Sequence, residues 1–378
     1  MHKILSFLIA TAFVVLPSVS NAQTMQTTVA KQAIIVDLDT GSVLLEKNAN
    51  ERMPTSSMSK VMTIYMVLEA IKEGRLHLSD ELPVSKKAWK KGGSKMFVEV
   101  GKKVKVQDLI RGVAVQSGND ATIVLAEGIA GSEDVFAQTM TMKAQEIGMK
   151  NSQFMNASGW PNPDHYSTAR DLATLSERLI QDFPEYYSYF GEKEFTYSNI
   201  KQSNRNPLLF RNMGVDGIKT GHTDIGGYGL MASGVRGDRR IVVVVNGLEN
   251  EKARANESAR LMEWGFRSFE NKTLLKSGQT IETAEVFLGQ APSVSLVIDE
   301  DVRVTLPKVD QEKLKVTVSY EEPFMAPVIK GAVVGKLRIE MPGMFKQEYD
   351  LKTGEHIPEL GFLPKTMAKA KYFLLGSY

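Results

Sequence analysis

The stretch that decides the fold is Pro54-Thr55-Ser56-Ser57-Met58-Ser59-Lys60, because the hydrophobic pattern of the chain changes there. Before it, residues 33–38 and 42–46 are strand-like runs around the turn Asp39-Thr40-Gly41, which predicts a β-hairpin. From Ser57 onward, apolar residues recur at the spacing of a helix with one buried face, at Val61, Ile64, Tyr65, Leu68 and Ile71. Thr55, Ser56 and Ser57 are candidate N-cap residues for this helix.

The middle of the chain is largely helical and returns to strand patterns later. Residues 107–116, 121–130 and 251–269 have helical patterns, whereas 228–235 and 241–245 have strand patterns. A sheet built from both ends of one domain, with helices between, is the economical arrangement. The predicted fold class is therefore α/β (α+β), with a first domain over residues 27–271.

Beyond about residue 272, apolar and polar residues alternate almost everywhere. The alternating runs lie at 302–306, 314–320 and 337–341, between turns at Pro307, Pro323 and Pro342-Gly343. This pattern predicts a small all-β domain, a sandwich, over residues 272–355.

The first residues have the pattern of a secretory signal. Met1-His2-Lys3 is a short basic start, residues 4–16 are apolar, and Ser20-Asn21-Ala22 offers small residues for cleavage near Ala22. A transmembrane anchor is the alternative, but the apolar run is about 13 residues and a span needs roughly 20. We therefore expect residues 1–22 to be a signal peptide and the protein to be exported.

Composition excludes several classes of function. The chain has 378 residues, no cysteine and a formal net charge of +2, so we expect no nucleic-acid partner, no disulfide and no thiolate site. No HExxH, GxSxG or Walker motif occurs, which gives a Ser-His-Asp enzyme little support. The few histidines are scattered, so we expect no metal and no cofactor; they are His2, His77, His165, His222 and His356.

The first candidate catalytic group is the pair Ser57 and Lys60, an SxxK pattern at the start of a periodic helix. Residues at i and i+3 share one helix face, so the lysine amine can approach the hydroxyl that it must deprotonate. Ser198-Asn199-Ile200-Lys201 has the same pattern in a stretch without helical periodicity. Either match by itself is more readily explained by chance.

Ser117-Gly118-Asn119 is the second candidate, directly after the predicted helix 107–116. A hydroxyl and a carboxamide on one short turn can point into the same cleft. A helix C-cap would also explain Gly118 and Asn119, but it leaves Ser117 without a role.

Lys219-Thr220-Gly221, followed by His222, is the third candidate. On an edge strand Lys219 and Gly221 would share one face, with positive charge from the lysine and close approach of a ligand backbone at the glycine. Lys352-Thr353-Gly354 repeats the tripeptide near the C-terminus, where we expect a turn beyond the all-β domain and interpret the match as chance.

The ordered combination of the three patterns is far more specific than any one of them. With its longer strings Pro54–Lys60, Ser117-Gly118-Asn119-Asp120-Ala121 and Asp216-Gly217-Ile218-Lys219-Thr220-Gly221-His222-Thr223, the chain resembles the low-molecular-mass penicillin-binding proteins of the D-alanyl-D-alanine carboxypeptidase type. The resemblance covers nearly the whole chain. It implies an antiparallel sheet with helices on both faces, followed by a small β-domain.

The resemblance implies a role for each matching residue. Ser57 would attack the penultimate D-Ala carbonyl and form an acyl-enzyme, with Lys60 as general base. Lys60 must be neutral for this, which burial and the second cation Lys219 would favour. Ser117 would pass the proton to the leaving D-Ala nitrogen, and Asn119 would hold an amide of the peptide stem.

The remaining implied roles concern substrate binding. Lys219 and Thr220 would bind the terminal carboxylate, and the backbone N–H groups of Ser57 and His222 would form an oxyanion hole. Arg254 lies in a stretch where the family has an arginine, so it is a candidate second anchor for the carboxylate. A solvated arginine on a helix is the alternative for Arg254.

The implied substrate is a peptidoglycan stem peptide ending in D-Ala-D-Ala, and β-lactam antibiotics would be covalent inhibitors. A D,D-endopeptidase uses the same chemistry and stays open. A serine β-lactamase is disfavoured because residues 156–171 contain no glutamate that could hold a deacylating water. A non-catalytic penicillin sensor would be expected to lack one of the motif residues.

The tail, residues 358–378, predicts an amphipathic helix. Leu363, Met367, Ala370 and Leu374 fall on one face, and Lys365 and Lys369 fall opposite. The run is too short to span a bilayer, so we expect a helix that lies on the membrane surface. The resemblance places such a protein at the periplasmic face of the inner membrane. The alternative is a helix whose apolar face packs on the β-domain.

Overall fold

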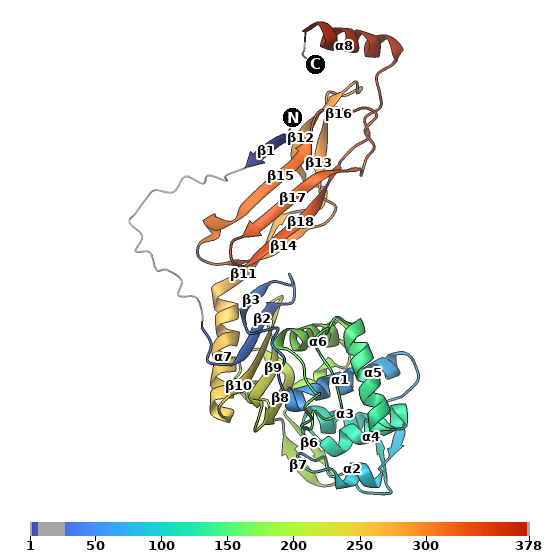
Figure 1. Cartoon of the computed structure of the whole chain (residues 1–378), viewed down its shortest axis with the longest axis vertical. Coiled ribbons are helices and arrows are strands. Elements are labelled where there is room, and N and C mark those ends of the chain that lie inside the picture. The colour runs from blue at the N-terminus through green and yellow to red at the C-terminus, as the bar shows by residue number, and fades with distance from the viewer. Residues whose placement is uncertain (1, 7–26, 376–378) are drawn as a thin grey trace, which may run out of the picture. The chain divides into compact units, whose positions relative to one another are not determined.

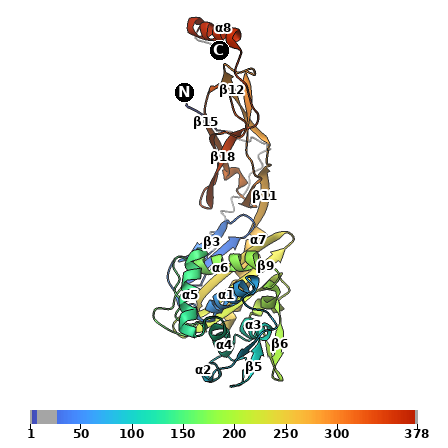
Figure 2. The ribbon, with the colours of Figure 1, turned by 90° about the vertical axis from the view of Figure 1, so that its right-hand side faces the viewer.

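The computed structural model describes residues 2–6 and 27–375. The chain divides into two compact units, Met25–Arg267 (the larger unit) and Ser268–Tyr378 together with Met1–Thr24 (the β-rich unit). Both are drawn in Figure 1 and, turned by 90°, in Figure 2. The expected cleavage point near Ala22 lies outside the described residues, whereas His2–Ser6 form strand β1, antiparallel to β15 (Lys315–Glu321).

The larger unit is built on a five-stranded sheet in which every neighbouring pair is antiparallel. Its order is β3 (Val43–Lys47), β2 (Gln32–Asp37), β10 (Arg239–Leu248), β9 (Gly227–Arg236) and β8 (Val215–Thr223). The expected hairpin is confirmed as β2 and β3, and the expected strands 228–235 and 241–245 as β9 and β10. The antiparallel sheet therefore contains strands from the beginning and from the end of the unit's sequence.

Helices cover both faces of this sheet, as the fold class predicted (Figure 1). Alternate residues of a strand face opposite sides. A Cβ on Gly265 of α7 (Glu251–Ser268) would meet Ile241 and Ile35, so these residues face α7. Val242 and Val244 belong instead to the hydrophobic core shared with the other helices.

The remaining elements of the unit are η1 (Ser56–Ser59), α1 (Lys60–Lys72), β4 (Glu81–Pro83), α2 (Lys86–Lys90), β5 (Lys103–Lys105), α3 (Val106–Ala114), α4 (Asn119–Ala130), α5 (Glu133–Glu146), α6 (Ala169–Asp182), η2 (Tyr187–Gly191), β6 (Glu194–Tyr197), β7 (Ile200–Ser203) and η3 (Pro207–Phe210).

The structure refines the start of the first helix and excludes the C-cap alternative at Gly118 and Asn119. The helix expected from Ser57 begins as the 3₁₀ turn η1 and becomes α-helical only at Lys60. Thr55 takes the N-cap position of η1, as one of the candidates, but neither Thr55 nor Ser59 makes a side-chain cap hydrogen bond. The Thr55 hydroxyl instead bonds the Ser59 hydroxyl, at 2.5 Å. Gly118 and Asn119 are not a C-cap either: Gly118 is the N-cap of α4, and Asn119 is its first residue.

The β-rich unit is a seven-stranded sheet packed with the two-stranded sheet of β11 and β14 around one core, as expected of a sandwich. Its order is β1-β15-β17-β18-β13-β12-β16, and the three alternating runs fall on β14, β15 and β17. The elements not yet given are β11 (Phe269–Leu275), β12 (Thr280–Phe287), β13 (Ser293–Val297), β14 (Val302–Pro307), η4 (Gln311–Lys313), β16 (Phe324–Met325), β17 (Val333–Met341), β18 (Phe345–Thr353) and α8 (Phe362–Leu375).

Candidate active site

Ser57 and Lys60 meet within one turn. Lys60 Nζ donates a hydrogen bond to Ser57 Oγ at 2.7 Å. Because η1 is a 3₁₀ turn with three residues per turn, side chains at i and i+3 eclipse each other, which aligns this pair. The SxxK pattern therefore places an amine against a hydroxyl, as its spacing predicted.

Lys60 is fully buried, which makes its charge costly. Burial, followed by the positive charges of Arg205 and Lys91, holds the pKa of Lys60 well below its ordinary value, against an opposing effect of Asp120. Lys219, the second cation expected from the sequence, is not among the charges that lower the pKa of Lys60. Lys60 also donates to the carbonyl oxygen of Ser158 at 2.7 Å, so the amine is held in place from the far side of the turn.

The Ser117-Gly118-Asn119 turn connects α3 with α4. Ser117 is buried and has a φ of +60°, a conformation that a non-glycine residue adopts rarely and that clusters at functional sites. Asn119 Nδ2 donates to the carbonyl of Gly92 at 2.8 Å. In the described part of the chain, Ser117 makes no hydrogen bond to Ser57 or Lys60.

Asp120, which the sequence argument gave no role, holds this turn against the segment before it. Its carboxylate is buried and accepts hydrogen bonds from the backbone N–H groups of Met96, Phe97 and Val98, at 2.8, 2.8 and 3.2 Å. The negative charge of Asp120 also raises the pKa of Lys60, so the turn lies within electrostatic range of the Ser57–Lys60 pair.

Lys219, Thr220 and Gly221 lie on β8, the edge strand of the sheet, as expected. Lys219 is buried, and burial together with the charges of Lys60, Arg205 and Arg254 holds its pKa well below the ordinary value. Gly221 also allows a close approach within the protein. A Cβ there would lie 2.9 Å from the Thr55 carbonyl oxygen, so a glycine is needed where β8 packs against the backbone that leads into η1.

His222 and Arg254 meet the same aromatic ring. The His222 ring stacks on Tyr228 with centroids 3.8 Å apart, and the Arg254 guanidinium lies 5.6 Å from that ring centroid. Arg254 is only 5% exposed, and its Nε has no hydrogen-bond partner among the described residues. The alternative of a solvated helix arginine is therefore wrong, and the buried cation has a free donor.

Arg205 is a site residue that the sequence argument missed. Its Nη1 donates to Ser94 Oγ at 2.5 Å. Its positive charge lowers the pKa of both Lys60 and Lys219. No sequence pattern could have identified Arg205, because it belongs to none of the three motifs. Together these cations suit a ligand that carries a carboxylate.

His165 contacts Ser59, which lies between Ser57 and Lys60 in the chain. Its Nδ1 accepts the Met155 N–H at 3.1 Å, so its Nε2 carries the proton and donates to Ser59 Oγ at 2.8 Å. Burial, then the Lys60 charge, lowers the pKa of His165 to about 4. The contact of this histidine is to Ser59 and not to Ser57.

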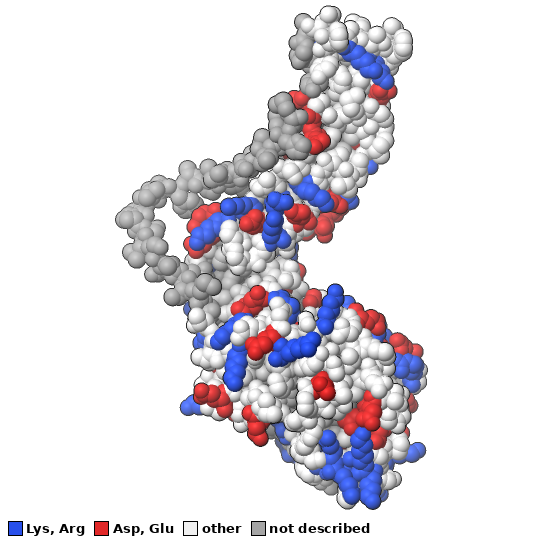
Figure 3. Space-filling view, in the orientation of Figure 1, with Lys and Arg blue, Asp and Glu red and all other residues white. Residues whose placement is uncertain are grey.

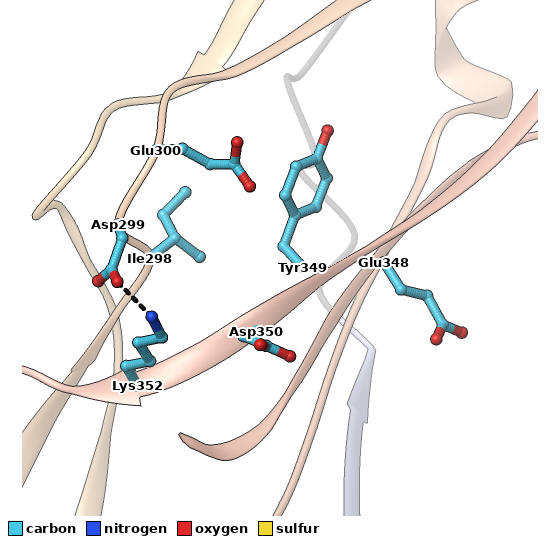
Figure 4. Close-up of a pocket in the computed structure, with 7 residues that line it drawn as sticks. All are labelled: Ile298, Asp299, Glu300, Glu348, Tyr349, Asp350 and Lys352. Atoms are coloured by element: carbon cyan, nitrogen blue, oxygen red, sulfur yellow. Dashed lines mark hydrogen bonds and ion pairs between the residues drawn. The ribbon is translucent and has the colours of Figure 1, made fainter. Parts of the chain in front are cut away.

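The second SxxK pattern and the second KTG tripeptide lie on other elements than Ser57 and Lys219. Ser198 and Asn199 form the turn between β6 and β7, and Lys201 pairs with Glu194 at 2.8 Å. The expected turn at the second KTG tripeptide is wrong, because Lys352 and Thr353 belong to strand β18 of the β-rich unit. Lys352 pairs with Asp299 in a pocket of about 240 Å³ (Figure 4). Among the described residues, no group of three or more His, Asp or Glu side chains could hold a metal ion.

Comparisons with known proteins show which family the chain belongs to. The profile of the D-alanyl-D-alanine carboxypeptidase family matches residues 19–250, and that of the penicillin-binding protein 5 C-terminal domain matches residues 269–359. D-alanyl-D-alanine carboxypeptidase DacC of Escherichia coli strain K12 is 41% identical over 88% of this chain and 85% of its own length.

Two solved structures extend the comparison. Penicillin-binding protein 5 from Haemophilus influenzae has a TM-score of 0.77 and 37% identity over 88% of this chain and 99% of its own. Penicillin-binding protein D2 from Listeria monocytogenes, solved with ampicillin bound, has a TM-score of 0.59 and 30% identity over 64% of this chain and 99% of its own. With matches to both profiles and to relatives along most of its length, the chain belongs to the D-alanyl-D-alanine carboxypeptidase family.

Proposed function

We propose that this penicillin-binding D-alanyl-D-alanine carboxypeptidase acts through an acyl-enzyme on Ser57, with Lys60 as general base. The observation that carries the proposal is the 2.7 Å hydrogen bond between Lys60 Nζ and Ser57 Oγ, made by a buried lysine whose pKa is held low. A neutral Lys60 amine takes the hydroxyl proton while Ser57 Oγ attacks the carbonyl carbon of the penultimate D-Ala.

The attack produces a tetrahedral oxyanion, which the backbone N–H groups of Ser57 and His222 stabilise. Gly221 supports this role because its contact with the Thr55 carbonyl brings β8 against η1. The C–N bond then breaks, and the terminal D-Ala leaves after its nitrogen takes a proton through Ser117. Water hydrolyses the ester that remains on Ser57, and Asn119 binds an amide of the stem.

The terminal carboxylate binds at the cationic end of β8. Lys219 and Thr220 contact it from the strand, and Arg254 contacts it from α7. The buried, unpaired Nε of Arg254 supports this assignment, because a buried donor without a partner is costly until a ligand accepts its hydrogen bond.

The test is the release of free D-Ala from a pentapeptide ending in D-Ala-D-Ala, with Ser57→Ala as the control. We expect release by the natural protein and none by the variant. Release that survives in Ser57→Ala would contradict the acyl-enzyme proposal. A crosslinked peptide dimer in the same assay measures endopeptidase activity, which the proposal does not require.

We further propose that the protein is exported and lies at the outer face of the cytoplasmic membrane, held by α8. No helix among the described residues is both long and apolar enough to cross a bilayer. The apolar stripe of α8 is uncovered, with Leu374 79% exposed, whereas Tyr372 on the opposite face contacts Phe287 with ring centroids 5.2 Å apart. Figure 3 shows basic side chains along one side of α8, which suits anionic headgroups.

A further inference from the structure

The segment from α2 to β5 has a high density of positive charge. Residues 86–105 contain eight lysines and one acidic residue, Glu99, in a chain whose formal net charge is +2. The lysines are Lys86, Lys87, Lys90, Lys91, Lys95, Lys102, Lys103 and Lys105. Six of them are exposed, and Lys91 and Lys95 are half-buried. Charges of both signs are ordinarily interspersed on a solvated surface, so charge of one sign indicates an anionic partner.

Two elements present four of these lysines to solvent. Lys86 and Lys90 are one helical turn apart on α2, on the side away from the buried Ala88. On β5, Lys103 and Lys105 flank the buried Val104 and therefore share the exposed face of the strand. Lys86, Lys90, Lys103 and Lys105 are called the lysine surface below.

Hydrogen bonds hold β5 beside the start of α2. The N–H of Val84, two residues before α2, donates to the Lys102 carbonyl at 2.9 Å, and the N–H of Gly101 donates to the Val84 carbonyl at 3.1 Å. Figure 3 shows basic side chains gathered where Figure 1 labels α2. The lysines of the two elements therefore lie close together.

The lysine surface has no acidic partner within the protein. Lys87, the neighbour of Lys86, forms an ion pair with Glu133 at 2.9 Å. In the part of the chain that the structure describes, none of the four members of the lysine surface forms one. Like charges one helical turn apart repel each other, and a bound anion relieves that repulsion.

Exposed aromatic rings accompany the lysines. Trp89 on α2 is 42% exposed, and Phe97 is 44% exposed. The backbone of Phe97 has a φ of +71°, which a bulky residue rarely adopts, and it is held there by the hydrogen bond from its N–H to Asp120 at 2.8 Å. Such conformations cluster at functional sites. The face of a sugar ring can pack on aromatic side chains of this kind.

The same segment reaches the proposed active site. The carbonyls of Gly92 and Ser94 accept hydrogen bonds from Asn119, from its Nδ2 at 2.8 Å and from its backbone N–H at 2.7 Å. Arg205 donates to the Ser94 hydroxyl at 2.5 Å. The chain therefore runs from the site directly into α2 on one side and toward β5 on the other. A substrate that extends beyond the site in this direction meets the lysine surface.

We propose that the lysine surface and Trp89 form a second binding site for polymeric peptidoglycan. The lysines bind carboxylates of the stem peptides next to the stem that is cleaved, and Trp89 packs on a sugar ring of the glycan strand. The proposal rests on the proposed function for the stem held at Ser57, and it adds that the polymer is bound at more than one point. Contacts to one strand reinforce each other, because the second contact is intramolecular.

The continuity with the site favours the glycan polymer over an anionic membrane. Lysines beside exposed aromatic rings would also suit lipid headgroups. The segment that carries them contacts Asn119 and Arg205, however, and this side of the protein has to stay accessible to the cell wall for the proposed reaction. A membrane is therefore the alternative that the experiment must distinguish.

The experiment separates binding of the polymer from turnover of a single stem. Binding to isolated sacculi is measured by sedimentation in the Ser57→Ala background, so that the stems are not consumed. We expect Lys86→Glu with Lys90→Glu to raise the Kd at least about fivefold in 0.1 M salt, and to make little difference in about 0.5 M salt. Lys103→Glu with Lys105→Glu, on the other element, should have the same effect.

Lys31→Glu with Lys150→Glu is the matched control, because it makes the same change of charge at two exposed lysines elsewhere in the larger unit. It should leave binding to sacculi unchanged. With Ser57 present, all these variants should release D-Ala from a soluble acetylated pentapeptide at the natural rate, whereas the two lysine-surface variants should show a raised KM for polymeric peptidoglycan. Equal losses with the soluble peptide would show a merely structural effect and overturn the proposal.

Two further measurements test the chemistry of the ligand. Sacculi whose carboxylates have been amidated with ethanolamine should bind the Ser57→Ala protein as weakly as its lysine-surface variants bind untreated sacculi. Trp89→Ala should weaken binding about threefold at low and high salt alike, whereas Phe210→Ala, which removes an exposed ring elsewhere in the unit, should not. Undiminished binding to amidated sacculi would contradict the proposal.

Vesicles of phosphatidylcholine and phosphatidylglycerol provide the membrane comparison. The lysine-surface variants of the full chain should bind them as the natural protein does. If these substitutions weaken binding to vesicles and not to sacculi, the surface contacts a membrane and the proposal is wrong. If D-Ala release from the soluble peptide persists in Ser57→Ala, the proposed function has failed instead, and the binding results still decide on the lysine surface.

Discussion

Lys60 Nζ lies between two oxygen atoms, Ser57 Oγ at 2.7 Å and the Ser158 carbonyl oxygen at 2.7 Å. The first contact is made within a single turn, and the second crosses to a loop far along the chain. A neutral Lys60 amine can donate to the Ser158 carbonyl and direct its lone pair at Ser57 Oγ, whose proton it then accepts along the 2.7 Å contact. The geometry therefore agrees with a lysine that is both held in place and basic.

Ser57→Ala is expected to abolish covalent labelling by a penicillin, because the variant lacks the hydroxyl that would be acylated. Ser198→Ala, in the β6–β7 turn, is the matched control and should label normally. Gel fluorography with a labelled penicillin measures both. Loss of labelling in the Ser198 variant instead would reverse the assignment of the two SxxK patterns.

The pKa of Lys60 should set the acidic limb of the pH profile of kcat/KM. A base acts when deprotonated, so activity falls as pH drops through its pKa, and a lowered pKa moves this limb to lower pH. Lys60→Arg cannot supply a neutral base and is expected to be as inactive as Lys60→Ala. Substantial turnover by the arginine variant in a stopped D-Ala assay would remove Lys60 from the base role.

Lys219→Ala is expected to reduce kcat/KM for a D-Ala-D-Ala peptide by at least tenfold, about 1.4 kcal/mol, because it removes a cation from the carboxylate site. Lys352→Ala removes the lysine of the repeated KTG tripeptide and should leave kcat/KM unchanged, since that lysine pairs with Asp299. Similar losses in the two variants would contradict the assignment of Lys219.

His165 should make the protein sensitive to acid. Its pKa is lowered from the ordinary value of 6.5 to about 4, so between these values the unfolded chain binds a proton that the folded chain does not. The free energy of unfolding contributed by His165 is therefore fully present above pH 6.5 and is lost as pH falls toward 4. Urea unfolding across this range should show a shallower decline for His165→Gln than for the natural protein; parallel curves would exclude this linkage.

Truncation after Gly361 removes α8 and leaves the hydrogen bond from Leu360 N–H to the Leu288 carbonyl intact. We expect the truncated protein to hydrolyse a soluble peptide normally and to leave the membrane fraction, because α8 provides the exposed apolar stripe. Sedimentation with vesicles containing anionic lipid measures the change. A truncated protein that still sediments, or that melts at a markedly lower temperature, would show that α8 is more than an anchor.

The features that could be predicted from the sequence are those that depend on residues close together in the chain. The Ser57–Lys60 contact spans three positions, so its spacing alone predicts that the two side chains meet. Alternating apolar residues likewise predicted β14, β15 and β17, and helical spacing predicted the amphipathic α8. The resemblance then supplied the roles of the three motifs, which remain proposals at the level of single residues.

The surroundings of these residues depend on contacts between segments that are far apart in the chain. The Ser158 carbonyl reaches Lys60 from 98 positions away, and Arg205 adds its charge from another loop, so no local pattern contains either contact. Gly221 also permits the packing of β8 on the segment that leads into η1, a requirement that no local pattern shows. Arg254 has the sequence context of a surface residue and is buried by the ring of Tyr228 and its neighbours. Burial and long-range charge depend on which segments pack together, and that is why the electrostatics of this site could not be predicted from local spacing.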